Sequence, residues 1–236
     1  MNKLFEQNLD KLGITLSESQ RNQFDAYYKL LIEWNKVMNL TGITEYQEVN
    51  LKHFIDSLSL VRVCDMKSHI KVIDIGTGAG FPGIPLKIAF PDLEITLLDS
   101  LGKRIKFLDT VISELGLTGV ETIHGRAEDF SKDKKYREQY DVCVSRAVSR
   151  LATLSEYCLP YIRVGGIFIS YKSGEIDEEI ENSISALNIL GGKVNEVDRF
   201  EISGTDIKRS FVKIEKIGST PEKYPRKAGV PDKKPL

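Results

Sequence analysis

A glycine-rich segment near the first third of the chain restricts its fold more than any other feature. Residues 72–83 read Val-Ile-Asp-Ile-Gly-Thr-Gly-Ala-Gly-Phe-Pro-Gly, a β-branched run that leads into glycines spaced two residues apart. This pattern predicts a strand, a tight loop and a helix that starts at Pro82, with backbone amides pointing at a ligand. The next apolar run ends in Asp99, whose carboxylate can accept hydrogen bonds from both hydroxyls of a ribose. The segment therefore predicts a site for a cofactor that contains a nucleoside.

Two cofactors compete for this site, NAD and S-adenosylmethionine. Asp74 lies beside the loop, where its carboxylate would repel a pyrophosphate, and Pro82 removes an N–H from the helix start. S-adenosylmethionine has no phosphate, and its ammonium and sulfonium groups are cations that a carboxylate attracts. The order Asp74-x-Gly76-x-Gly78-x-Gly80 therefore favours the methyl donor over NAD. A glycine-rich turn that binds nothing is the alternative without a ligand.

Length and composition leave room for one α/β domain with an extension. Among 236 residues, 33 Lys and Arg oppose 34 Asp and Glu, so the net charge of −1 does not indicate nucleic acid. Basic residues cluster at 103–106, 132–137 and 216–236, as solvated surface or as phosphate contacts. The three cysteines lack a metal or redox spacing, and no apolar run approaches the roughly 18 residues that span a membrane. We expect a cytoplasmic protein with reduced thiols, without a signal peptide, membrane segment or metal.

The apolar periodicity changes near residue 70. Before it, a capping box at Ser17 and Gln20 predicts a helix to Met38, and a second helix is expected from Thr44 to Val63. After it, strands alternate with helices, which predicts a parallel, doubly wound sheet. Strands are expected near 71–75, 95–99, 120–124, 140–145, 165–172, 193–202 and 209–217, and helices near 82–90, 103–116, 150–162 and 175–190.

The turn 203–206 is too short for a parallel crossover, so the last two strands should pair antiparallel. The expected fold is α/β, of the class I S-adenosylmethionine-dependent methyltransferase type. It is Rossmann-like, with a seven-stranded, mostly parallel sheet, an antiparallel last strand and a helical N-terminal extension. We divide the chain into the extension (1–68), the Rossmann-like methyltransferase core (69–217) and a basic, Pro-rich C-terminal arm (218–236).

The residues after the fourth expected strand limit which kinds of substrate atom the protein could methylate. Val144-Ser-Arg-Ala147 lacks the Asn/Asp-Pro-Pro-aromatic loop that handles exocyclic amines, and Cys143 and Cys158 lie within predicted elements. No catalytic carboxylate or histidine is evident. The N7 atom of guanine carries a lone pair and no proton, so it can attack a sulfonium methyl by proximity and alignment, without a general base. Arg146 can hold guanine O6, a phosphate or the methionine carboxylate, or form a surface ion pair.

The third expected strand is followed by Gly125-Arg-Ala-Glu-Asp-Phe130. Class I methyltransferases often place an acid directly after this glycine to receive the adenine amine. Because Arg126 stands there instead, we assign adenine to the backbone of Ala127 and to Glu128. The alternative role for Glu128 and Asp129 is that of acids that favour a helix start.

Seven motifs along the chain agree, in order, with one known family. They are Trp34-Asn-x-x-x-Asn-Leu-Thr41, His53-x-x-Asp-Ser-Leu58, Asp74-x-Gly-x-Gly-x-Gly-Phe-Pro-Gly-x-Pro85, Leu98-Asp-Ser-x-x-Lys-Arg104, Gly125-Arg-Ala-Glu128, Ser145-Arg-Ala147 and Tyr224-Pro-Arg-Lys-x-Gly-x-Pro231. The chain thereby resembles the GidB family, also called RsmG, over nearly its whole length. The family methylates N7 of one guanine, conventionally position 527, in 16S ribosomal RNA of the small subunit. The resemblance implies this activity, with S-adenosylmethionine as the cofactor.

The motifs and the resemblance together give a set of expected site residues. The cofactor-binding residues are Gly76, Gly78, Gly80, Phe81, Asp99, Ala127, Glu128 and Arg146, and the catalytic residues are Arg146 and Lys172. The candidate RNA contacts are Lys103, Arg104, Arg126, Arg199, Arg226 and Lys227. Asn39 and His53 are candidates for RNA contact or the active-site wall, with a helix cap and a packing group as their structural alternatives. We expect 16S ribosomal RNA or the small subunit as partner, and a monomer.

Other functional classes also fit parts of the sequence. One is another class I methyltransferase, acting on transfer RNA or a small molecule, although the basic tail argues against a small substrate. A nicotinamide dehydrogenase is a further alternative. The last is a non-catalytic ribosome-assembly factor that binds S-adenosylmethionine, which would bind the cofactor tightly and methylate no RNA.

Overall fold

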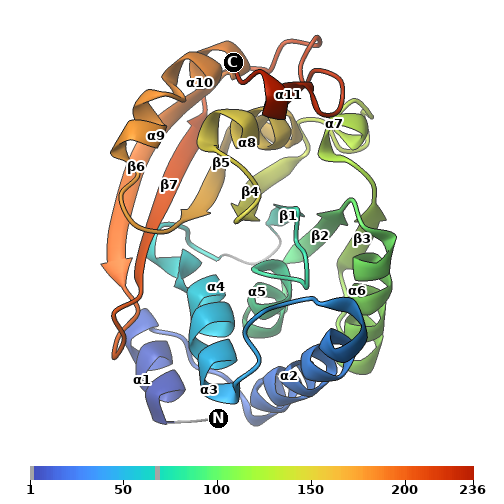
Figure 1. Ribbon diagram of the computed structural model, residues 1–236, viewed down its shortest axis with the longest axis vertical. Coiled ribbons are helices and arrows are strands. Elements are labelled where there is room, and N and C mark those ends of the chain that lie inside the picture. The colour runs from blue at the N-terminus through green and yellow to red at the C-terminus, as the bar shows by residue number, and fades with distance from the viewer. Residues whose placement is uncertain (1–2, 67–69) are drawn as a thin grey trace.

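The centre of the molecule is a single seven-stranded sheet (Figure 1). The computed structural model describes residues 3–66 and 70–236, so His69 and the expected boundary between extension and core lie outside the described residues. The strands are β1 (Lys71–Ile75), β2 (Glu94–Asp99), β3 (Val120–His124), β4 (Tyr140–Arg146), β5 (Ile162–Lys172), β6 (Gly192–Glu201) and β7 (Lys208–Lys216). All seven expected strands are confirmed, to within a few residues at their ends.

The strand order is β3-β2-β1-β4-β5-β7-β6. β1 pairs in parallel with β2 and β4, whereas β7 lies between β5 and β6 and is antiparallel to both. The expected antiparallel last strand is therefore confirmed. Because β1 to β5 run in the same direction, their carboxyl ends meet at one edge of the sheet, where open α/β sheets bind their ligands.

Helices cover both faces of the sheet, and each face has its own apolar core (Figure 1). One face carries α1 (Lys3–Leu12), α2 (Glu18–Met38), α3 (Tyr46–Val49), α4 (Asp56–Leu58), α5 (Gly83–Ala89) and α6 (Gly102–Glu114). The other carries α7 (Ala127–Phe130), α8 (Leu151–Cys158), α9 (Asp177–Glu181), α10 (Ile184–Leu190) and α11 (Val230–Lys233). None of the helices in the described residues is both long and apolar enough to cross a bilayer.

Helix α2 has the ends that its sequence predicts. The Ser17 side chain accepts a hydrogen bond from the Gln20 amide (3.2 Å), and the Gln20 side chain accepts one from the Ser17 amide (2.8 Å). At the other end Asn39 has a left-handed backbone (φ 49°), and its N–H donates to the carbonyl of Asn35. Asn39 is therefore a helix C-cap, a position at which Asn tolerates positive φ.

The second expected helix, from Thr44 to Val63, is wrong in its start and its regularity. It begins at Tyr46 without a side-chain cap and contains a π-helical turn, η1 (Asn50–Ile55), before α4 and a 3₁₀ turn, η2 (Ser59–Arg62). Within η1 the carbonyl of Lys52 accepts a hydrogen bond from the Arg146 side chain of β4 (3.2 Å). A side chain from a distant strand thus replaces the backbone N–H that the Lys52 carbonyl would bind in a regular α-helix. The apolar periodicity of the sequence cannot predict such a contact.

Two expected helices on the other face are also less regular than their sequence pattern. The helix expected at 175–190 is two short helices, α9 and α10, and the one expected at 150–162 ends as the 3₁₀ turn η3 (Leu159–Tyr161). The three cysteines are buried in the two cores, as the places of Cys143 and Cys158 in the sequence predict.

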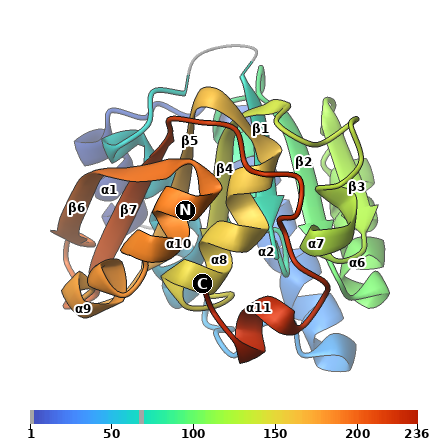
Figure 2. The same cartoon turned by 90° about the horizontal axis from the view of Figure 1, so that it is seen from above.

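The C-terminal arm packs on the face that carries α8. Figure 2 shows it crossing α8 before it reaches α11. Tyr224 is buried in the apolar core of this face. The next residue but one, Arg226, donates to the carboxylate of Glu156 from its side chain (2.6 Å) and from its backbone N–H (2.7 Å), and Glu156 is completely buried. The guanidinium of Arg226, a candidate RNA contact, is thus held by a buried carboxylate.

Replacement of Arg226 by alanine should destabilise the fold strongly. The change leaves the charge of Glu156 buried without its partner, and loss of one partner of a buried pair typically lowers the free energy of unfolding by about 3–5 kcal/mol. Urea denaturation measures this loss. Lys227→Ala, at the exposed neighbouring residue, is the matched control and should change stability by less than about 0.5 kcal/mol. Equal stability of the two variants would contradict this role for Arg226.

Candidate functional site

A cavity of about 320 Å³ lies at the carboxyl ends of β1, β2, β3 and β4. Four predicted cofactor residues line it, namely Gly76, Asp99, Ala127 and Glu128. Two predicted RNA contacts, Arg104 and Arg126, lie on the same wall. The cavity is near the lower end of the size range of small-molecule sites. The structure therefore brings together the residues that the sequence assigned to a nucleoside.

The side chain of Asp74 stabilises the glycine loop through hydrogen bonds. Its Oδ2 accepts hydrogen bonds from the Thr77 hydroxyl (2.7 Å) and the Gly83 N–H (2.9 Å), and the residue is completely buried. Burial raises the pKa of this carboxyl to about 6. Asp74 does not line the cavity. The sequence placed its carboxylate near the cationic groups of the cofactor, whereas in the structure it stabilises the loop.

The loop glycines differ in their roles. A Cβ on Gly76, which has φ +71°, would lie 2.6 Å from a methyl group of Val148, so a side chain there would fill the space beside the cavity. Gly78 and Gly80 are not in the cavity wall. The amide of Gly78 donates to Asp99 (2.9 Å), and a Cβ on Gly80 would collide with the side chain of Ile84 at 2.6 Å. These two glycines shape the loop.

Asp99 is buried, and the loops around it fix the orientation of its carboxylate. Oδ2 accepts from the Gly78 amide and from the Arg104 guanidinium (3.1 Å), and Oδ1 accepts from the Leu101 amide (2.9 Å). A carboxylate oxygen has two lone pairs, so Oδ1 can accept one more bond. One ribose hydroxyl can therefore bond to Oδ1, whereas a second would replace Arg104.

A second cavity, of about 360 Å³, adjoins the first at Ala147, which lines both. Four cations line it, from Lys52, Arg146, Lys172 and Arg209. We call it the basic cleft. Its other walls are Ile43, His53, Asp56, Ala147, Tyr171 and Ser173. Both predicted catalytic residues, Arg146 and Lys172, thus lie in one cleft beside the first cavity.

Arg146 is held in place from three sides. Its Nη1 donates to Asp56 (2.7 Å), its guanidinium carbon lies 5.0 Å from the centre of the Phe81 ring, and its Nη2 donates to Nδ1 of His53 (3.3 Å). Arg146 does not line the first cavity. Phe81, a predicted cofactor residue, is likewise not in that wall and supports Arg146 and His53 instead. The contact with Phe81 is a cation–π interaction.

Asp56 and Arg209 were missed by the analysis of the sequence. The buried carboxylate of Asp56 binds Arg146 through one oxygen and Nε of Arg209 (2.6 Å) through the other. Asp56 stands in one of the family motifs, so the resemblance contained a signal for it. Arg209 has none, because only the place of β7 beside β5 brings it to the cleft.

His53 is a neutral hydrogen-bonded group in the wall of the cleft. Its ring stacks on Phe81 at 4.5 Å, and burial, together with the charge of Arg146, lowers its pKa to about 3. Because a guanidinium only donates, Nδ1 is the acceptor and Nε2–H donates to the Thr41 hydroxyl (2.8 Å). Both ring nitrogens are engaged, so His53 has no site left to take a proton from a substrate.

Lys172 ends β5, as the sequence predicts, at the carboxyl edge of the sheet. Its ammonium group donates to the Ser149 carbonyl (2.8 Å) and to Glu179 (2.6 Å), and its side chain is 14% exposed. Lys172 therefore ties the loop after β4 to α9 while it lines the basic cleft.

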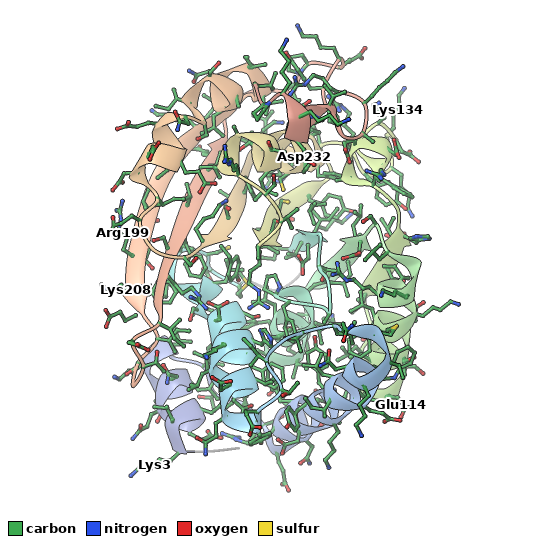
Figure 3. All side chains as sticks on the ribbon, in the orientation of Figure 1. Lys3, Glu114, Lys134, Arg199, Lys208 and Asp232 are labelled. Atoms are coloured by element: carbon green, nitrogen blue, oxygen red, sulfur yellow. The ribbon has the colours of Figure 1, made fainter. Side chains whose placement is uncertain are left out.

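The predicted RNA contacts do not form one surface. Arg199 lies on β6 at the outer edge of the sheet, where it binds Asp177 (Figure 3). Lys103, Arg126 and Lys227 are exposed. Within the described residues Arg126 and Lys227 make no side-chain hydrogen bond, and Lys103 reaches only the Met38 carbonyl at 3.5 Å.

A family model and two relatives of this chain share one description. A family model, GidB, described as rRNA small subunit methyltransferase G, matches residues 20–210. A protein from Lachnoclostridium phytofermentans, named ribosomal RNA small subunit methyltransferase G, is 52% identical over 100% of this chain and 97% of its own length. A protein of the same name from Clostridium novyi is 50% identical, over 96% of this chain and 93% of its own.

Solved structures show the same fold at low sequence identity. TYW2 from M. jannaschii, solved in complex with AdoMet, is 16% identical with a TM-score of 0.51, over 64% of this chain and 71% of that one. TrmN from Thermus thermophilus is 16% identical with a TM-score of 0.53, over 69% and 48% of the two chains. The expected class I methyltransferase fold is confirmed.

The protonation of His53 can be followed by NMR. With a pKa near 3, the imidazole should stay neutral, so its ring signals should not shift between about pH 5.5 and pH 8. The chain has three histidines, and the spectrum of His53→Gln identifies the signal that disappears. A His53 signal that titrates near pH 6.5 would contradict the arrangement with Arg146 and Thr41.

Asp74 should make stability depend on pH in a defined direction. Its pKa of about 6 exceeds the value of about 3.9 for an unfolded aspartate. Between these values the folded state keeps the proton that the unfolded chain releases, so the free energy of unfolding falls as pH rises. Asp74→Asn removes this effect, so its stability relative to the wild type should increase from about pH 4 to about pH 7 in urea denaturation. Asp206→Asn, at an exposed residue, should show no such trend.

Proposed function

The chain belongs to the GidB family, rRNA small subunit methyltransferase G, and from this premise we propose the reaction and the role of each cavity. The protein transfers the methyl group of S-adenosylmethionine to N7 of a guanine, conventionally position 527, of 16S ribosomal RNA in the small subunit. The first cavity holds the cofactor, and the basic cleft holds the guanine. The relatives' names support ribosomal RNA as the substrate. N7 as the methylated atom is supported by the described residues that line the basic cleft, among which His53 has both ring nitrogens engaged and Asp56 is bound to two cations.

The observation that carries this proposal is the contact between the two cavities at Ala147. One cavity contains acceptors that suit a nucleoside, and the other contains four cations beside the rings of His53 and Tyr171. A methyl donor and an acceptor base bound in them would meet at the loop after β4. Proximity and alignment of two reactants in this way can lower a barrier by roughly 7–11 kcal/mol.

The residues of the basic cleft orient a base and take no proton from it. S-adenosylmethionine, held by Gly76, Asp99 and Glu128, would supply an electrophilic methyl group, and transfer of this group to N7 would leave the positive charge on the purine. Arg146 donates to guanine O6 from a position fixed by Asp56 and Phe81. Lys172 and Arg209 bind the backbone phosphates on either side. His53 stays neutral and sets the orientation of Arg146.

The carboxylate of Asp56 makes the cleft suitable for a base that becomes cationic. Arg146, Lys172, Arg209 and Lys52 alone would oppose the charge of N7-methylguanine. Asp56 is hydrogen-bonded to two of these four cations and compensates part of their charge. The exposed cations of Lys103, Arg126 and Lys227 extend the binding surface to RNA outside the cleft, where each phosphate contact adds to salt-dependent affinity.

One cleavage experiment tests both the proposed RNA substrate and N7 as the methylated atom. Unmodified small subunits and unmodified naked 16S RNA are incubated with the protein and S-adenosylmethionine, and borohydride with aniline then cuts the RNA at N7-methylguanosine. We expect a single cut at the guanine named above. Tight cofactor binding without any methyl transfer would favour the non-catalytic assembly factor, and transfer to another RNA atom would favour another class I methyltransferase.

Arg146→Ala separates the basic cleft from the cofactor cavity. Because Arg146 lies in the cleft and not in the cofactor wall, the dissociation constant of S-adenosylmethionine should change less than about threefold, while methylation at saturating cofactor falls by about 100-fold or more. Arg163→Ala is the matched control, since Arg163 forms an exposed ion pair with Asp141 near the start of β5. A large loss of cofactor affinity with normal saturated activity would place Arg146 in the cofactor site instead.

A further inference from the structure

The C-terminal arm reaches the wall of the first cavity. Three hydrogen bonds tie it there: the Gly229 amide donates to Glu128 (3.3 Å), the Thr153 hydroxyl donates to the Pro231 carbonyl (3.1 Å), and the Ser149 hydroxyl donates to Asp232 (3.1 Å). Asp232 itself is one of the residues that line the cavity. Figure 3 shows Asp232 on α11, at the inner side of the arm.

The arm is anchored to the rest of the protein by residues that precede its cavity-lining residue in the sequence. Arg226 is bound to the completely buried Glu156 of α8, and Tyr224 lies in the core. Only five residues separate Arg226 from Asp232, so the ion pair limits where α11 can lie. The position of Asp232 at the cavity is therefore a consequence of the packing of the arm on α8.

The carboxylates at this wall have acceptor capacity left for a ligand. Asp232 accepts from Ser149 through Oδ1, and Tyr157 is the other partner of its side chain. Glu128 accepts from Gly229 through Oε1, and its second oxygen makes no hydrogen bond within the described residues. An ionised carboxylate only accepts, at about four lone-pair sites. A ligand that donates N–H or O–H groups matches this wall.

We propose that Asp232 is a cofactor-binding residue, which accepts a hydrogen bond from the adenosine half of S-adenosylmethionine, and that the arm encloses this half. The inference rests on the proposed cofactor. The adenine amine and the ribose hydroxyls are the donors of this half. Of the neighbours of Asp232 at the wall, Glu128 follows β3, where the sequence assigns the adenine, and Tyr157 comes from α8. We place the methionine end at the glycine loop, beside Gly76, which lines the same cavity.

Cofactor binding and arm docking are then coupled. A ligand that gains a contact only when the arm is docked stabilises the docked arm by the same factor by which docking raises its affinity. The arm should therefore open less often when the cofactor is bound. The residues that carry this coupling are far apart in the sequence, since Ser149 precedes Asp232 by 83 positions and Glu128 precedes Gly229 by 101.

Calorimetric titration with two ligands tests the contact. S-adenosylmethionine contains both halves, and 5′-methylthioadenosine contains the adenosine half alone. Asp232→Ala should weaken both ligands by about tenfold, and Asp232→Asn, which keeps one acceptor oxygen, should weaken both to a smaller extent. Glu222→Gln is the matched control, an exposed acid earlier in the same arm, and should change neither affinity by more than about twofold.

A comparison of the two ligands also shows which half of the cofactor Asp232 contacts. A loss with S-adenosylmethionine alone would place Asp232 at the methionine end and overturn the proposal. Unchanged affinities of both ligands for Asp232→Ala would overturn it as well. A wild-type protein that binds the cofactor but methylates no ribosomal RNA would contradict the proposed function and leave this result standing, because the titration contains no RNA.

Hydrogen exchange tests the coupling independently. Amides of residues 225–236 should exchange more slowly when S-adenosylmethionine is bound to the wild type and to Glu222→Gln. In Asp232→Ala this protection should be reduced at equal saturation with the cofactor. The same protection in Asp232→Ala as in the wild type would show that the arm does not sense the cofactor through Asp232, and would overturn the coupling.

Discussion

The buried carboxylate of Asp56, held between Arg146 and Arg209, is the interaction on which the site depends. It joins three parts of the chain, because Asp56 lies on α4 of the N-terminal extension, Arg146 ends β4 and Arg209 is the second residue of β7. A buried charge is unfavourable unless it is paired and hydrogen-bonded, so Asp56 requires both arginines. The extension is therefore a wall of the basic cleft. The cleft exists only when the extension is packed on the sheet.

The same arrangement fixes the chemical state of the neighbouring groups. Arg146 lies close to His53 and helps to keep the imidazole neutral, and the π-helical turn η1 turns the carbonyl of Lys52 toward Arg146. π-Helical turns are rare and frequent at functional sites. The first cavity, which we propose for the cofactor, depends on other contacts. Asp74 is hydrogen-bonded to the glycine loop, and the arm is bound to Glu156 through Arg226. The two cavities adjoin at Ala147, whose backbone is left-handed (φ 57°), a conformation that costs energy for a residue with a side chain.

The sequence predicted the fold well and the site in part. The structure confirms the capping box of α2 and the antiparallel pairing of the last two strands, which both follow from local patterns. It also places Asp99 and Glu128 at one cavity. The helix expected from Thr44 was wrong in its regularity, because the carbonyl of Lys52 accepts a hydrogen bond from Arg146, which is 94 positions away in the sequence. Arg209 and Asp232 were not predicted for a related reason. Neither has a local motif that separates it from an ordinary surface residue, and each reaches its cavity through the packing of β7 or of the arm.

Local chemistry and the family motifs determined what this protein binds and which family it belongs to, since a glycine loop after a strand and an acid after the next one are encoded within about thirty residues. The tertiary structure decided which of the candidate residues act together. It placed Arg146 in the basic cleft and not in the cofactor wall, assigned Arg226 to a buried ion pair, and brought α4, β4 and β7 to one carboxylate. The physical reason is that burial makes a charge depend on partners in space, and sequence separation says little about which partners those are.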